Sequence, residues 1–286
     1  MVPGKNEISN KMQASIIITT YNWPEALKAT LRSIVNQTIR SIEIIVADDG
    51  SGHATAQAVK EVLKPSDLAW IHVRQNDLGI RQARIKNLGV RYSRSPYLVF
   101  IDHDVVLHPN FINDHISMAE KGFFLQGKRV FLSEYSTQEI LFKGHFVPPS
   151  PLTKGLGNRK NAIRAPKLGK MMAWPKKFQT SLRGCNLSMY KKDFLNVDGY
   201  DETFDQLWGR EDSDICYRLF HKGLRLKNLW FSALQYHLDH KITKGRREDR
   251  LDSELRIVRR EKRIKALKGF SHLSSEGEIL SAADKY

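Results

Sequence analysis

The chain has 286 residues, with 46 Lys and Arg against 31 Asp and Glu, so its formal net charge is +15. Hydrophobic residues at 41% and aromatic residues at 9% are typical of a folded protein and exclude a chain that is disordered throughout. Residues 1–15 lack the apolar core of a secretory signal, and no apolar run approaches the roughly 20 residues of a membrane-spanning helix. Two cysteines, Cys185 and Cys216, are too few for a disulfide framework, and we therefore expect a soluble cytoplasmic protein.

The first part of the chain alternates short apolar runs with helical patterns. Strands are predicted at residues 15–20, 42–47, 69–73 and 97–101. Helices are predicted from Pro24, around residues 58–63 and over residues 80–90. Continuous apolar strands separated by helices indicate an α/β fold whose central sheet is mostly parallel and flanked by helices. Ligands of such a sheet bind beyond the carboxyl ends of the strands, where residues 19–21, 48–50 and 102–104 carry hydroxyl groups and acids.

The pattern is less regular in the second part of the chain. We expect a helix over residues 109–122 and a strand over residues 123–132. The Pro-, Gly- and Lys-rich residues 147–177 have no clear period and are interpreted as a long loop. Beyond it, helices are predicted at residues 190–197, 211–222 and 246–267, and a strand at residues 229–237.

Two segments carry the excess charge. Residues 152–183 contain nine basic residues and no acidic one, and residues 241–268 contain twelve basic and five acidic residues. A nucleic-acid-binding protein would spread cations over a face or interleave them with aromatic residues, so we expect no nucleic acid partner. Basic segments of this kind fit an anionic membrane surface, a phosphorylated acceptor or a solvated tail.

Two acidic clusters are candidates for chemistry. Asp102 and Asp104 follow an apolar strand and form a cradle of hard oxygen ligands for Mn²⁺ or Mg²⁺, although a polar turn at a strand end would look the same. Glu211 and Asp212 open a helix, where carboxylates are favoured by the helix dipole in any case. In a functional interpretation one of the second pair is a general base, with the ring of Trp208 as a platform for a sugar.

Five segments of the chain carry a resemblance to a known family. They are IIITTYN at 16–22, IVADDGS at 45–51, GIRQARIKN at 79–87, FIDHDVVLHPNF at 100–111, and a long block of motifs between residues 184 and 240. In this order they resemble a family 2 glycosyltransferase of the GT-A type with a galactosyltransferase-like C-terminal half. The resemblance implies a Rossmann-like sheet and inverting transfer of a sugar from a nucleotide diphosphate donor, usually UDP-linked.

The resemblance also implies a donor site. Thr19, Tyr21 and Asp49 would hold the nucleoside, with Asp49 accepting a hydrogen bond from the uracil N–H. Arg81 would lie near the uracil or the diphosphate, and Asp102 would contact the ribose or the metal.

The remaining roles that the resemblance implies concern the metal and the acceptor. Asp104 would be the principal metal ligand, and His237 matches a metal-binding histidine of related galactosyltransferases. Asp212 matches the catalytic base, while Glu211 and Trp208 would shape the sugar and acceptor sites.

Two positions depart from the pattern: His103 fills the middle of Asp-x-Asp, and Lys86 stands where arginine is frequent. His240 is a second candidate for the histidine ligand.

We therefore expect one GT-A domain over residues 13–240, with a donor half at 13–104, an acceptor and catalytic half at 105–240, and a basic helical tail at 241–286. The expected enzyme is an inverting, metal-dependent transferase that moves a hexose or N-acetylhexosamine from a UDP-sugar to a glycan or lipid-linked acceptor. Synthesis of bacterial surface polysaccharide or lipopolysaccharide, at the cytoplasmic face of the inner membrane, is the expected setting. The alternatives are a retaining UDP-GalNAc-type transferase, a nucleotidyltransferase and a nucleic-acid-binding protein.

Overall fold

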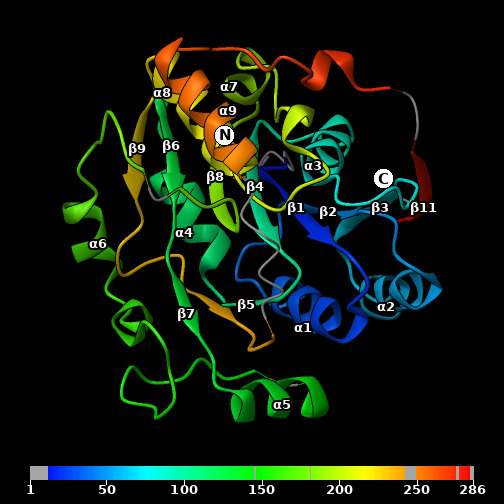
Figure 1. Cartoon of the computed structure of the whole chain (residues 1–286). Coiled ribbons are helices and arrows are strands. Elements are labelled where there is room, and N and C mark those ends of the chain that lie inside the picture. Colours follow the sequence, from blue (N-terminus) through cyan, green and yellow to red (C-terminus); the bar gives the residue numbers. More distant parts are fainter. Residues whose placement is uncertain (1–11, 145, 181, 242–248, 275–276, 284–286) are drawn as a thin grey trace, which may run out of the picture.

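A computed structural model describes residues 12–144, 146–180, 182–241, 249–274 and 277–283 (Figure 1). Its centre is an eight-stranded sheet, and a second sheet of three short strands lies beside it. The strands of the large sheet, in spatial order, are β11 (Glu278–Ala282), β3 (Ala69–Arg74), β2 (Ile42–Asp48), β1 (Ala14–Thr20), β4 (Tyr97–Asp102), β8 (Asn186–Tyr190), β6 (Phe123–Gln126) and β9 (Arg225–Asn228). The small sheet consists of β5 (Val105–Leu107), β10 (Gln235–His237) and β7 (Arg129–Phe131).

Helices cover both faces of the large sheet. Along β1 the side chains of Ile16 and Ile18 pack into one core and that of Ile17 into the other, as the two-residue period of a strand requires. One core includes residues of α1 (Pro24–Val35), α2 (His53–Leu63) and α4 (Phe111–Met118). The other includes residues of α3 (Gln82–Arg91), α7 (Lys191–Asn196), α8 (Glu211–His221) and α9 (Asp249–Arg260). The two groups of helices lie on opposite sides of the sheet in Figure 1.

The four strands predicted in the first part of the chain are confirmed. They form β3-β2-β1-β4, and every pair among these neighbours is parallel. Thr20 pairs with Asp48 and Thr19 with Asp102, so the three polar strand ends meet at one edge of the sheet. β4 and β8 are antiparallel, as are β8 and β6 and the outer pair β11 and β3, which makes the sheet mixed but mostly parallel around the site.

Three predictions for the second part of the chain are wrong. The strand expected over residues 123–132 is two strands, β6 and β7, which lie in different sheets. The chain turns between them at Gly127, where a Cβ atom would lie 2.2 Å from the side chain of Asn186. Within the strand expected over residues 229–237, only the last three residues form a strand, which is β10. The expected loop 147–177 contains a 3-10 helix, η1 (Arg159–Ala162), and α6 (Pro166–Met172).

Other elements were not predicted. They are β5, β8, β9, β11, the helix α5 (Glu134–Lys143), and the 3-10 helices η2 (Glu202–Phe204) and η3 (Phe270–His272). The helix expected over residues 246–267 is the shorter α9, and the start of that prediction, at residues 246–248, lies outside the described residues.

The C-terminal part of the chain packs on the domain. Leu251, Leu255 and Val258, which share one face of α9, are buried in the same core as α8. β11 then pairs with β3 at the edge of the large sheet. None of the described helices combines the length and the apolar character that a bilayer crossing requires.

Candidate functional site

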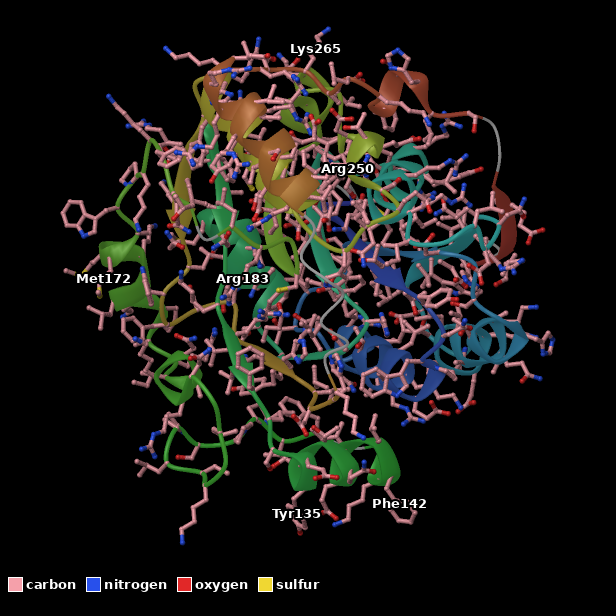
Figure 2. All side chains as sticks on the ribbon, in the orientation of Figure 1. Tyr135, Phe142, Met172, Arg183, Arg250 and Lys265 are labelled. Atoms are coloured by element: carbon pink, nitrogen blue, oxygen red, sulfur yellow. The ribbon has the colours of Figure 1, made fainter. Side chains whose placement is uncertain are left out.

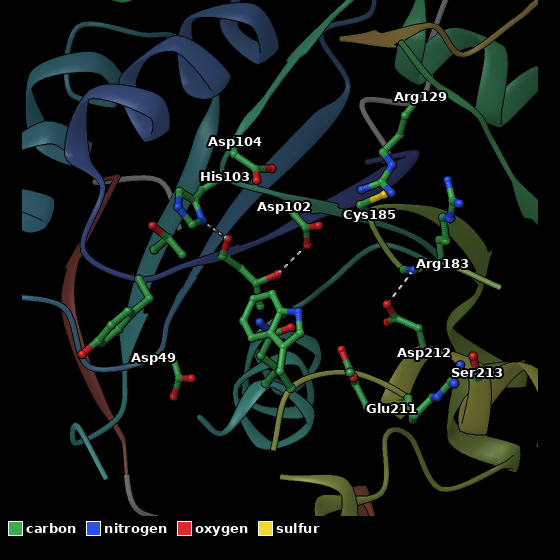
Figure 3. A pocket seen from close by; sticks show the side chains of 18 of the residues that line it. Asp49, Asp102, His103, Asp104, Arg129, Arg183, Cys185, Glu211, Asp212 and Ser213 are labelled. Carbon is green, nitrogen blue, oxygen red and sulfur yellow. Dashed lines mark hydrogen bonds between the residues drawn. The ribbon is translucent and has the colours of Figure 1, made fainter. Parts of the chain in front are cut away.

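A cleft with a volume of about 410 Å³ lies at the carboxyl ends of β1 and β4 (Figure 3). β1 has β2 on one side and β4 on the other, so the order of the strands reverses at this point of the sheet. Such a reversal opens a crevice beyond the strand ends in α/β sheets, because the connections leave toward opposite faces. The cleft is lined by residues that lie far apart in the sequence, among them Thr19, Tyr21, Trp23, Asp49, Asp102, Asp104, Arg129, Arg183, Cys185, Trp208, Glu211, Asp212 and His240.

One wall of the cleft holds a cluster of metal-ligand type. The Nε2 atoms of His237 and His240 lie 3.2 and 3.0 Å from Oδ2 of Asp104. Backbone pairing creates this cluster, because β10 runs antiparallel to β5 and sets His237 opposite Val105, the residue after Asp104. The amide of Leu238 also donates a hydrogen bond to the carbonyl of Asp104, at 2.9 Å.

The hydrogen bonds around this cluster fit a divalent cation. The Nδ1 atoms of His237 and His240 donate to the carbonyls of Leu238 and Lys241, which leaves the Nε2 atom of each ring facing Asp104. Oδ1 of Asp104 is buried and has no hydrogen-bond partner among the described residues. Two imidazole nitrogens and a carboxylate within 4.8 Å of one another suit Mn²⁺ or a similar ion. A cation would satisfy the ligand atoms that the protein leaves facing one another.

The two aspartates of Asp102-His103-Asp104 have opposite electrostatic environments. Burial and the neighbouring charge of Asp104 raise the pKa of Asp102 to about 7, although the charge of Lys86 acts in the opposite direction. Burial also disfavours the charge of Asp104, but hydrogen bonds from His237 and His240 outweigh it and lower the pKa of Asp104. The hydrogen bond to Asp104 raises the pKa of His240. Asp104 is therefore the carboxylate that stays ionised at neutral pH.

The opposite wall carries Asp212 on the first turn of α8. Its Oδ2 accepts a hydrogen bond from the amide of Gly184 at 2.7 Å, and its Oδ1 lies 2.9 Å from Nζ of Lys86. Lys86 also contacts Glu211, at 3.0 Å. Both carboxylates line the cleft, but the side chain of Asp212 is 23% exposed and that of Glu211 only 8%, so Asp212 is the more accessible of the pair.

Lys86 is the buried counter-charge of this pair. Burial disfavours its charge, but Asp212 and Glu211 outweigh burial and raise the pKa of Lys86 well above its usual value. Burial raises the pKa of Glu211, and Lys86 acts in the opposite direction. The turn that leads into α8 has positive φ at Gly209 and at Arg210, a costly conformation for arginine that orients the start of the helix toward the cleft.

The expected donor residues lie at the ends of β1 and β2. Thr19 Oγ1 is 3.4 Å from Oδ1 of Asp102, and the exposed Tyr21 donates a hydrogen bond to Asp77 at 3.1 Å. Burial raises the pKa of Asp49, although hydrogen bonds from the amide of Arg81, at 2.9 Å, and from Gln75 act to lower it. The guanidinium of Arg81 donates to the carbonyl of Asn76 instead of lining the cleft.

The structure brings eight of the ten predicted site residues to the lining of one cleft. The other two stand behind it: His237 contacts Asp104, and Arg81 supports Asp49 through its backbone. Sequence reasoning missed Arg129 and Arg183, which belong to none of the five motif segments, and Cys185, which lies in the last of them but was given no role in the site. The only sequence signal for the role of Lys86 was its departure from the expected arginine.

Comparison with known proteins adds two family matches. Residues 15–174 match the model of glycosyl transferase family 2, and residues 171–241 match the model described as the N-terminal domain of galactosyltransferase. The family 2 match contains the cleft residues Asp49, Asp102 and Asp104. The galactosyltransferase match contains Asp212, His237 and His240.

Curated relatives share the sequence over most of the chain. The chain is 29% identical to chondroitin synthase of Escherichia coli over 241 residues, which are 78% of this chain and 34% of the relative. It is 28% identical to hyaluronan synthase of Pasteurella multocida over 78% of this chain and 24% of the relative. Validoxylamine A glucosyltransferase of Streptomyces hygroscopicus is 29% identical over 73% of this chain and 52% of the relative. The chain thus spans about a quarter to half of the length of these proteins.

Solved structures share the fold. The Staphylococcus aureus protein TarS (residues 1–349, in complex with UDP-GlcNAc) superposes with a TM-score of 0.61 at 16% identity, over 92% of this chain and 69% of TarS. A mannosyltransferase from Pyrobaculum calidifontis, in complex with GDP-Man and Mn²⁺, gives a TM-score of 0.54 at 17% identity over 82% of this chain and 59% of its own.

Proposed function

Because the chain belongs to glycosyl transferase family 2, we propose that it transfers a sugar from a UDP-sugar to a hydroxyl group of a glycan or glycolipid acceptor. The observation that carries this proposal is the convergence of Asp104 and Asp212 on opposite walls of one cleft. The relatives that make polysaccharides, and the neighbour that binds UDP-GlcNAc, support bacterial polysaccharide synthesis and a UDP-linked donor.

The donor occupies the end of the cleft formed by β1, β2 and β4. Thr19, Tyr21 and Asp49 hold the nucleoside, with Arg81 keeping Asp49 in place through its amide. Asp102 contacts the ribose, and its proximity to Thr19 supports this position. The two carboxylate oxygens of Asp49 accept hydrogen bonds from Gln75 and from the amide of Arg81, and each has a further lone pair that can accept from the uracil N–H.

Asp104, His237 and His240 would hold Mn²⁺ or Mg²⁺, and Asp102 lies two residues before Asp104. Two imidazole ligands favour Mn²⁺ over Mg²⁺, which prefers oxygen ligands. A cation bound by these residues would neutralise charge on the diphosphate and so make the nucleotide a better leaving group. The neutral forms of both histidines are required, and their Nδ1 hydrogen bonds to backbone carbonyls fix the correct ring nitrogen.

Asp212 acts as the general base of an inverting displacement. It takes the proton from the acceptor hydroxyl while that oxygen forms a bond to the anomeric carbon and the bond from this carbon to the diphosphate breaks. Lys86 and the amide of Gly184 hold the carboxylate in position. Trp208, a residue that is 60% exposed and lines the cleft, and Glu211 shape the space for the sugar and the acceptor.

A nucleotide-release screen of UDP-, GDP- and dTDP-sugars with and without Mn²⁺ tests the proposal. We expect release from a UDP-sugar that depends on the metal, and an inverted anomeric configuration of the product by NMR. Asp212→Asn should lower turnover by about 10²–10⁴-fold with UDP affinity unchanged, the usual contribution of a general base. Asp104→Ala should remove the metal dependence of donor binding. No release from any nucleotide sugar would overturn the proposed activity, and a retained configuration would overturn its stereochemistry.

We also propose that the enzyme works at the cytoplasmic face of a membrane. The basic segments 152–183 and 241–268 support attraction to anionic lipid, at about 1 kcal/mol for each cation near the surface. Exposed apolar side chains on and after α6, including Met171, Met172 and Trp174, lie within the first of these segments.

A further inference from the structure

A second cavity, of about 330 Å³, adjoins the cleft and has a cationic lining. Arg129, Arg183 and Cys185 line both spaces, so the cavity and the cleft share one wall. Lys128 and Lys176 complete the set of charged side chains around the cavity. Four cations thus surround a space that no carboxylate lines.

The close contacts of these side chains are with neutral groups. Lys128 donates to Oδ1 of Asn228 at 2.7 Å and lies 4.3 Å from the ring centre of Trp230. Lys176 donates to Oε1 of Gln179 at 3.2 Å. Both amide oxygens are neutral acceptors, and among the described residues no carboxylate lies within ion-pair distance of the four cations.

Arg129 adds an unused donor. Its Nε is buried and has no hydrogen-bond partner among the residues that the structure describes. The backbone carbonyl of Arg129 is held by the side chain of Asn161 at 2.8 Å, which fixes the start of β7. Leaving a buried guanidinium donor without an acceptor costs free energy that an anionic ligand would recover.

The cations also disfavour one another. Burial, followed by the charges of Lys176, Arg183 and Lys160, lowers the pKa of Lys128 to about 8. Burial and the charge of Arg129 lower the pKa of Arg183 as well. Repulsion of this kind is relieved when an anion enters.

We propose that this cavity binds an anionic group, a phosphate or a carboxylate, on the acceptor substrate. The proposal rests on the transferase activity proposed above. The position of the cavity favours the acceptor over the donor, because Arg183 precedes Gly184, whose amide holds Asp212. In Figure 3 Arg129 and Arg183 lie on the side of Asp212, whereas Asp49 of the expected nucleoside site lies at the opposite end of the cleft. An anion bound here would anchor the acceptor with a hydroxyl group near the base.

The test compares three small acceptor analogues that differ in charge: methyl glucoside, methyl glucuronide and methyl glucoside 6-phosphate. Their dissociation constants are measured by NMR titration of the full chain with saturating UDP and Mg²⁺, so that the phosphate analogue does not occupy the donor site. We expect at least one anionic analogue to bind tenfold or more tightly than the neutral one. A preference for the phosphate or for the glucuronide identifies which of the two anions the acceptor carries.

Variants of the cavity complete the test. Lys176→Glu, at an exposed position, and Lys128→Gln should each weaken binding of the preferred anionic analogue about tenfold, the equivalent of 1.4 kcal/mol, with UDP affinity unchanged. The control Lys121→Glu/Lys192→Glu alters two exposed lysines that lie away from the carboxyl end of β4. Lys121 lies just before β6, and Lys192 lies at the start of α7. This control should bind the analogues like the wild-type protein.

Two outcomes would overturn the anion site. They are equal affinities of the three analogues for the wild-type protein, and an unaltered anion preference in Lys176→Glu. Because UDP affinity is measured separately, a failure of the proposed donor site would appear as loss of UDP binding with the anion preference intact.

Discussion

At the scale of single residues, Asp212 can face the cleft because residue 184 has no side chain. A Cβ atom on Gly184 would lie 1.9 Å from Oδ1 of Asp212. Gly184→Ala should therefore displace the carboxylate and lower turnover about 10–100-fold, since a misplacement of about 1 Å can cost about 10²-fold. Steady-state kinetics check this, with Gly52→Ala as the control, because the nearest atom to its Cβ would be 3.8 Å away. Equal turnover in the two variants would contradict the role of Gly184.

The cluster of Asp104, His237 and His240 leads us to predict that its affinity for Mn²⁺ depends on pH. His240 has a raised pKa because its Nε2 can share a proton with Asp104, and that proton occupies the place of a cation. A rise in pH through this pKa removes the proton, so Mn²⁺ affinity should rise by up to about tenfold per pH unit until His240 is neutral. Calorimetric titration with Mn²⁺ between pH 6 and pH 8 measures the slope. His240→Gln should bind more weakly with a flatter slope, and an affinity that falls as the pH rises would contradict the assignment.

The sequence predicted single residues best where they belong to a strand-end motif. Asp49, Asp102 and Asp104 follow apolar strands, and parallel pairing alone brings such ends together. The position of Lys86 under Asp212 could not be predicted, because it depends on how α3 and α8 pack across 126 residues of sequence. Arg129 likewise enters the cleft only because the chain turns at Gly127 into the second sheet.

At the scale of elements, α9 supports the helix that carries Asp212. Leu251 of α9 is buried in the core that α8 lines, and Asp252 accepts a hydrogen bond from Arg210, the residue before α8, at 2.6 Å. Leu251→Ala should lower the free energy of unfolding by about 2–3 kcal/mol, as expected for a large buried side chain. Urea denaturation measures this, and the exposed Arg256→Ala on the same helix serves as the control. A change below about 0.5 kcal/mol in Leu251→Ala would show that α9 is not part of the cooperative core.

Element length explains which strands could be predicted. β1, β2, β3 and β4 have six or seven residues and read as continuous apolar runs because helices cover both faces. β5, β7 and β10 have three residues each, too few for a period, and they exist only through pairing with one another. Strands predicted over residues 123–132 and 229–237 include β7 and β10, but their pairing with β5 into a separate sheet could not be predicted from the sequence.

At the scale of the whole molecule, the proposed membrane contact has a defined surface. Figure 2 shows Met172 of α6 on one flank of the molecule and Tyr135 and Phe142 of α5 at another end. Met171 and Trp174 are 75% and 74% exposed, and Met171→Ser/Trp174→Ser should lower binding to vesicles with anionic lipid about fivefold or more by removing apolar contact. Sedimentation with anionic and neutral vesicles measures the bound fraction.

The control for the membrane contact is Tyr135→Ser/Phe142→Ser, which removes two aromatic side chains from α5 that are 76% and 91% exposed. Vesicle binding of this control should equal that of the wild-type protein. If both double variants bind like wild type, the flank around α6 is not the contact surface. Point substitutions are preferable to removal of residues 246–286, because α9 and β11 are packed on the domain.

The ends of the large sheet affect how copies of the protein behave in concentrated solution. The outer strand β11 has a register shift between Ile279 and Ser281, and Glu278 lies beside Arg74 on its inner neighbour. On the far side, the backbone of Leu226 in β9 exchanges hydrogen bonds with Lys176 at 2.8 and 2.9 Å. Bulges, charges and occupied amides at the margins of a sheet oppose pairing with a strand from another molecule. Crowded molecules should therefore resist polymerising into fibrils through their sheets.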